Sequence, residues 1–82
     1  MKYLSDLKED SIAKIISFNR NFISPSQVTE LLELGFFPGA EIICLESIPT
    51  LDKMIFQISG TRVGLRIGDC SHIEIQMKEK VS

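Results

Sequence analysis

The sequence has few of the residues that mark a catalytic or metal-binding protein. Its 82 residues include one histidine, two cysteines and no tryptophan. The cysteines are far apart and form no Cys-x-x-Cys pair, so they predict free thiols that fill apolar space rather than a disulfide framework. No Gly-x-Ser-x-Gly elbow and no phosphate-binding loop are present. We therefore expect neither an enzyme nor a bound cofactor.

Long hydrophobic runs and a strong charge of one sign are also missing. No apolar stretch approaches the roughly 20 residues of a membrane-spanning helix, and the N-terminus, MKYLSDLKED, is too polar for a signal peptide. We therefore expect a cytoplasmic protein with no direct membrane insertion. Nine basic and eleven acidic residues give a net charge of −2, which argues against binding to the phosphate backbone of a nucleic acid.

The residues that are present suffice for one small folded domain over residues 1–82. Hydrophobic residues make up 44% of the chain, which supports a core and argues against disorder. Five stretches rich in apolar, often alternating residues predict β-strands: 11–18, 40–48, 54–59, 63–67 and 73–77. The absence of βαβ units favours a small β-barrel, mainly β with short helices. Imperfect alternation in the first stretch predicts a bulge, and Gly64 predicts either a bulge or a close backbone approach.

The clearest local signal is a helix that begins after Ser24. Ser24 and Gln27 have the spacing of a capping box, and Pro25 suits the first helical position. The helix of about ten residues should pack on the core through apolar side chains that share one face: Val28, Leu31 and Leu32, with Leu34 beside them.

Glycines mark the turns around this helix and later in the chain. Gly35 suits the left-handed residue just past the helix end. Pro38 and Gly39 suit the two central positions of a type II turn. Gly60 belongs to a tight connection between the third and fourth strands. We interpret these positions, with the helix cap, as structural.

Two neighbouring aromatic residues and two arginines are the candidate partner contacts. Phe36 and Phe37 predict one ring in the core and one partly exposed, and the exposed ring beside Pro38 could meet a protein partner. Arg62 and Arg66 are either solvated charges or contacts for an acidic partner. With the outward side of the helix, the candidate partner site comprises Glu33, Leu34, Phe36, Phe37, Pro38, Arg62 and Arg66.

One combination of side chains has the chemistry of a metal site. Cys44, Cys70 and His72 would offer two thiolates and an imidazole to a soft divalent ion. The alternative, in which both cysteines pack in apolar surroundings, is favoured because Cys44 lies in an apolar strand and Cys70 in a short turn. We therefore expect no metal site.

Two motifs, in order, resemble those of the FeoA family of ferrous iron transport proteins. Residues 32–42, LELGFFPGAEI, resemble the family's L-x-E-L-G-φ-x-P-G-x-x-φ core, where φ is hydrophobic. Residues 60–70, GTRVGLRIGDC, resemble its G-x-x-φ-A-L-R stretch, and the opening LSDLK fits its start. The resemblance implies an SH3-like barrel of about five strands with a short helix after the first strand.

The resemblance also implies a function. It indicates a cytosolic accessory protein of bacterial ferrous iron uptake that docks on the cytosolic GTPase region of the membrane transporter FeoB and modulates it. A GTPase activator that uses Arg62 or Arg66 is one alternative. A ferrous iron carrier or sensor is another, and a weak homo-oligomer is left open.

Overall fold

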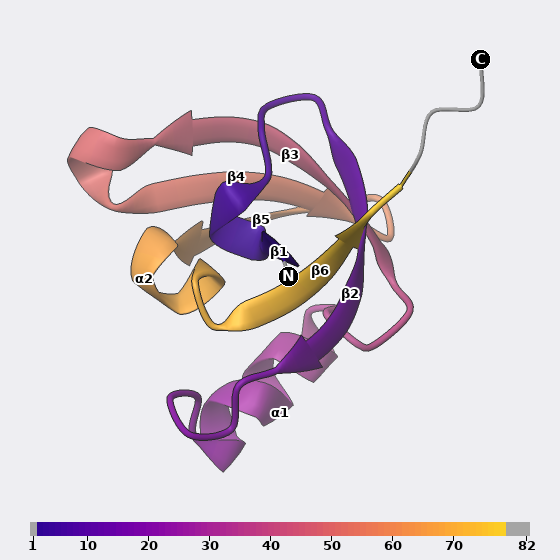
Figure 1. Cartoon of the computed structure of the whole chain (residues 1–82), viewed down its shortest axis with the longest axis vertical. Helices are drawn as coiled ribbons and strands as arrows, with labels where there is room; N and C mark the ends of the chain where they lie inside the picture. Colours follow the sequence, from indigo (N-terminus) through magenta and orange to yellow (C-terminus); the bar gives the residue numbers. More distant parts are fainter. Residues whose placement is uncertain (1, 79–82) are drawn as a thin grey trace.

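The computed structural model describes residues 2–78, which form one bent antiparallel sheet with short helices around it (Figure 1). The strands are β1 (Lys2–Tyr3), β2 (Ile12–Phe18), β3 (Glu41–Ile48), β4 (Lys53–Ile58), β5 (Thr61–Arg66) and β6 (Ile73–Met77). The helical segments are α1 (Pro25–Glu33), α2 (Ile67–Cys70) and two single 3-10 turns, η1 (Leu4–Asp6) and η2 (Pro49–Leu51).

The strands lie in the order β1-β6-β2-β3-β4-β5, and every neighbouring pair is antiparallel. The predicted fold, mainly β with short helices and a helix after the first long strand, is confirmed. The prediction of about five strands missed only the two-residue β1. Within residues 2–78 the sheet stays open, with β1 and β5 as its two edges.

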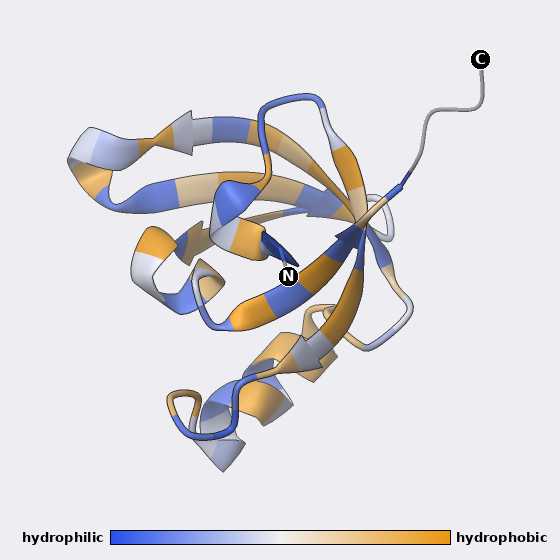
Figure 2. Cartoon of the chain, in the orientation of Figure 1, coloured by the Kyte–Doolittle hydropathy of each residue, from blue (hydrophilic) through white to orange (hydrophobic). Residues whose placement is uncertain are grey.

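The predicted bulge in β2 is confirmed, and it changes which side chains reach the core. The register between β2 and β6 shifts between Ile15 and Ser17. Phe18 is therefore buried together with Ala13 and Ile15, while Ile16 faces solvent. Without the bulge, the two-residue alternation of a strand would place Ile16 and Phe18 on the same face. Figure 2 shows hydrophobic and hydrophilic residues alternating along the neighbouring strand β6.

The start of α1 is as predicted. The backbone N–H of Gln27 donates to the Ser24 hydroxyl at 3.3 Å, and the Gln27 side-chain oxygen accepts from the Ser24 N–H at 3.0 Å. Pro25 occupies the first helical position. The predicted packing face was too wide: among the apolar residues of the nine-residue helix, Val28 and Leu31 are buried. Leu32 is 44% exposed, because the face that meets the core is a narrow stripe.

Two glycines set the backbone conformation of the segment after α1. Gly35 has a φ of +98° and Gly39 a φ of +93°, which L side chains rarely adopt. The Phe37 carbonyl accepts from the Ala40 N–H at 2.9 Å and closes the turn around Pro38 and Gly39. The predicted helix stop and turn are both confirmed.

The β4–β5 hairpin turns on two residues with positive φ, Ser59 at +50° and Gly60 at +75°. Gly64 lies opposite Ile55 in an unbroken register, so it marks no bulge. A Cβ at Gly64 would lie 2.9 Å from Cε of Lys53, which is a side-chain atom, so the predicted close approach of another backbone is not found there either. Ile67, predicted at the end of this strand, is the first residue of α2 because the chain turns after Arg66.

The core fills the concave side of the sheet. Leu4 and Leu7, from the segment around η1, are buried over one end of it, and both cysteines are buried in it. No helix formed by residues 2–78 is long and apolar enough to cross a membrane.

Candidate partner-binding site

The two neighbouring phenylalanines point in opposite directions. The Phe36 side chain is fully buried and meets Phe56 edge to face, with ring centroids 6.3 Å apart. Phe37 is 47% exposed. The prediction of one ring inside and one partly outside is confirmed. Including Phe36 among the partner contacts was wrong, because its ring belongs to the core.

Exposed apolar side chains gather at the C-terminal end of α1. Leu32, Leu34 and Phe37 are each more than two-fifths exposed, and Pro38 beside them is exposed as well. These four residues are called the helix-end patch below. Glu33 is exposed among them and adds one carboxylate. Exposed apolar residues that lie together are typical of a surface that binds another protein.

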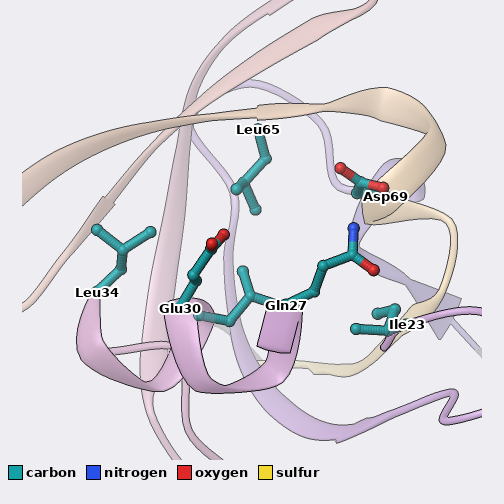
Figure 3. A pocket seen from close by; sticks show the side chains of 7 residues that line it. Ile23, Gln27, Glu30, Leu34, Leu65 and Asp69 are labelled. Atoms are coloured by element: carbon teal, nitrogen blue, oxygen red, sulfur yellow. The ribbon is translucent and has the colours of Figure 1, made fainter. Parts of the chain in front are cut away.

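A groove runs from this patch between α1 and the segment β5–α2. Its lining comes from three parts of the chain: Ile23, Gln27, Glu30, Leu31, Leu34, Leu65 and Asp69. In Figure 3, Leu65 points from β5 toward the helix, and Gln27 and Glu30 point from the helix into the groove. The groove holds about 90 Å³, which suits one or two side chains rather than a cofactor. Leu34 lies at its end and belongs to both surfaces.

The two candidate arginines lie on another face. Val63 is buried and Leu65 lines the groove, so Arg62 and Arg66, which alternate with them, point to the outer face of the sheet. Both arginines are exposed. The predicted site is therefore brought together in part, with Leu34, the exposed ring and Glu33 at the helix end and the arginines on the far side of β5.

The structure does not assemble the candidate metal ligands. Within residues 2–78, no three His, Cys, Asp or Glu side chains are grouped so that they could hold a metal ion. The His72 ring stacks on Phe22 instead, with centroids 4.4 Å apart and planes 5° from parallel. Cys44 and Cys70 are fully buried, as expected for thiols that pack in apolar surroundings.

Burial also makes both thiols poor ligands. Burial raises the pKa of the Cys70 thiol to about 12, and the nearby Asp69 carboxylate adds to the shift. Burial likewise raises the pKa of Cys44, with a further contribution from Glu9. Metal ions bind the thiolate, so thiols that stay protonated near neutral pH argue against an iron carrier that uses these side chains.

The raised Cys70 pKa predicts an alkaline loss of stability. As pH rises above the ordinary thiol value, the unfolded chain releases this proton and the folded chain retains it. The free energy of unfolding should therefore fall by about 1.4 kcal/mol per pH unit from this group, from about pH 9 upward. Urea unfolding at pH 8 to 10.5 would measure the slope. The Cys70→Ala variant should show a shallower slope, and equal slopes would contradict the prediction.

Sequence reasoning missed the groove. Ile23 lies just before the predicted helix, and Leu65 lies in the fourth predicted strand, where it alternates with Arg66. Gln27 was predicted only as part of the capping box, and Asp69 only as part of the motif of residues 60–70. Nothing local joins these residues, because their meeting depends on how α1 packs beside β5. The alternation that placed Leu65 inward was the one available hint.

Comparisons with known proteins agree with this geometry. A family model described as the FeoA domain matches residues 2–77. The structure of FeoA from Stenotrophomonas maltophilia complexed with zinc, described as a prokaryotic SH3 domain protein, is 25% identical. Its TM-score is 0.78, over 93% of this chain and 91% of that one. This confirms the SH3-like fold.

Two further structures are similar. Iron(II) transport protein A from Clostridium thermocellum is 26% identical with a TM-score of 0.82, over 93% of this chain and 45% of that one. FeoA from Chlorobium tepidum is 22% identical with a TM-score of 0.87, over 99% of this chain and 74% of that one, and it supports the fold alone. No curated protein sequence matches the chain.

Proposed function

The chain belongs to the FeoA family, which is associated with ferrous iron transport, and from this premise we propose that it is a cytosolic accessory protein that docks on the cytosolic region of FeoB and modulates it. The Stenotrophomonas relative is described as a candidate activating factor of ferrous iron transport. That description supports a regulatory role and says nothing of how the activation occurs.

The observation that carries the proposal is the helix-end patch. Leu32, Leu34 and Phe37 are all exposed within six residues. Aromatic residues in such a patch commonly dominate the binding energy of a protein interface. We infer that Phe37 is the main contact and that Leu34 leads the interface into the groove.

Replacing Phe37 tests this proposal. Phe37→Ala should weaken binding to the cytosolic region of FeoB by about 30-fold, because losing a central aromatic contact costs about 2 kcal/mol. Isothermal titration calorimetry with the two purified proteins would measure it. GTP turnover by the same FeoB region, with and without the chain, would separate stimulation from docking alone.

A matched control is available at Leu51. This side chain is 68% exposed on η2, in the β3–β4 connection, well away from α1 in Figure 1. Leu51→Ala removes exposed apolar surface of comparable kind and should leave binding unchanged. Equal affinities for wild type and Phe37→Ala would remove the helix-end patch from the site. Failure of the wild-type chain to bind would overturn the proposed function itself.

A further inference from the structure

The edge strand β5 presents unpaired backbone groups. The Ile67 N–H donates to the Asp52 carbonyl at 3.1 Å, in the register that continues the β4–β5 ladder. Hydrogen-bonded and non-bonded pairs alternate along an antiparallel ladder. Arg62 and Gly64 therefore direct their N–H and C=O groups away from β4, toward the free edge. Arg66 directs its N–H there, while its C=O, at the N-cap of α2, accepts the first bond of that helix.

This edge is open to solvent. Gly64 is exposed, and because glycine has no side chain, its exposure is that of the backbone. Within residues 2–78, no strand pairs with this side of β5, and no loop or turn donates a backbone hydrogen bond to Arg62 or Gly64. An open strand edge of this kind can accept another strand.

The outer face beside the edge is basic. Lys53 of β4 lies opposite Arg66, and its side chain passes close to Gly64. Lys53, Arg62 and Arg66 form no ion pair with any of the described residues. By register, the nearest carboxylate on this face is that of Glu46. Glu46 pairs with Ile55, which pairs with Gly64, so Glu46 lies two strands, or about 10 Å, from Gly64. We call Lys53, Arg62, Gly64 and Arg66 the basic edge.

We propose that the basic edge binds an extended segment of a partner protein, which adds to β5 as a further strand and places acidic residues opposite Arg62 and Arg66. Side chains alternate between faces, so the segment reads acid–apolar–x–apolar–acid, with a small residue at x opposite Gly64. Its apolar residues face the side of Val63 and Leu65. Only the identity of the partner protein that carries this segment rests on the proposed function.

The groove decides which side chains of the added segment lie on the inner face of the sheet. An apolar side chain next to Leu65 would enter the groove, where Leu31 and Leu34 offer apolar contacts. Glu30 and Asp69 also line the groove and repel a carboxylate there. Acidic residues on the outer face and apolar residues on the inner face are therefore the complementary arrangement.

A second copy of the chain is a poor occupant. Antiparallel pairing of two β5 strands about Gly64 would place Arg62 opposite Arg66 of the copy, and Arg66 opposite Arg62 of the copy. Like charges in directly opposed positions destabilise a sheet. The partner segment must therefore have a different sequence, with opposite charge at these positions.

Synthetic peptides test the pattern directly. Fluorescently labelled TEVSLET should bind at least ten times more tightly than TVESELT, which has the same composition with its acids on the wrong face, and than the charge-reversed TKVSLKT. Fluorescence anisotropy would measure affinity. Amide hydrogen exchange by NMR should show new protection at the N–H groups of Arg62, Gly64 and Arg66. Equal binding of TEVSLET and TVESELT would overturn the inference in favour of non-specific charge attraction.

Two substitutions at Gly64 separate strand addition from charge. Gly64→Pro removes the outward N–H without breaking a bond to β4, a position at which edge strands tolerate proline. Gly64→Ala keeps the N–H, and its Cβ meets only the flexible end of Lys53. Binding of TEVSLET should fall at least tenfold in the proline variant and stay near wild type in the alanine variant.

Two further outcomes complete the test. Arg62→Ala and Arg66→Ala should each weaken TEVSLET binding about two- to five-fold, and they decide the case if the proline variant fails to fold. If TEVSLET does not bind but the cytosolic region of FeoB still binds the wild-type chain, the inference is wrong and the proposed function stands. If neither binds, both are wrong.

Discussion

Phe36→Ala is expected to lower the free energy of unfolding by about 3–5 kcal/mol, the cost of removing a large buried ring. The Phe36 side chain is fully buried and meets Phe56 edge to face, so the vacated space has no easy way to collapse. For a domain of this size the melting temperature should fall by roughly 15 °C or more. Urea unfolding followed by circular dichroism would measure the change.

The neighbouring ring supplies the control. Phe37→Ala makes the same chemical change at a side chain that is 47% exposed, and it should cost less than about 1 kcal/mol. In the binding assay the order of the two variants should be reversed, with Phe37→Ala showing the larger loss of affinity. Similar destabilisation by both would mean that the inside and outside assignments of the rings are wrong.

Features of this fold that depend on neighbouring residues could be predicted from the sequence. The Ser24–Gln27 capping box, the helix stop at Gly35 and the turn at Gly39 each require only residues within about four positions. The bulge in β2 was also visible, because a break in the two-residue period is itself a local signal. Such features need no knowledge of what the segment packs against.

The width of a buried helix face could not be predicted in this way. Helical periodicity placed Val28, Leu31 and Leu32 together, and the first two are indeed buried. How far the buried stripe extends depends on the surface opposite, and α1 meets the sheet along a narrow line. Leu32 is outside it, which is why a residue predicted to pack on the core joins Leu34, already a candidate partner contact, in the helix-end patch.

The basic edge illustrates a different limit. The sequence showed two outward cations, Arg62 and Arg66, on one strand and a glycine between them. A barrel of hydrogen-bonded strands has no edge, so the predicted barrel left no reason to look for one. Only the strand order, which leaves β5 without a second neighbour among residues 2–78, turns these residues into a candidate binding edge.

Leu4→Ala is the second substitution with a large expected effect, a loss of about 2–5 kcal/mol in the free energy of unfolding. Leu4 is fully buried, and it stands in η1 between the two-residue β1 and the first long strand. The pairing of only two residues of β1 with β6 stabilises the N-terminal segment little. The buried Leu4 and Leu7 must therefore hold this segment over the core. Leu51→Ala, the same change at a side chain 68% exposed, should stay within about 0.5 kcal/mol of wild type.

The extent of the unfolding that Leu4→Ala promotes distinguishes two roles for the N-terminal segment. If Leu4 is part of the cooperative core, the urea midpoint falls and amide exchange accelerates throughout the sheet, including β3 and β4. If the segment is only a local cover, exchange accelerates in β1 and β6 and the midpoint hardly moves. We expect the first result, because η1 contacts both α2 and β6 and thereby joins the segment to the two elements that follow the free-edged strand β5.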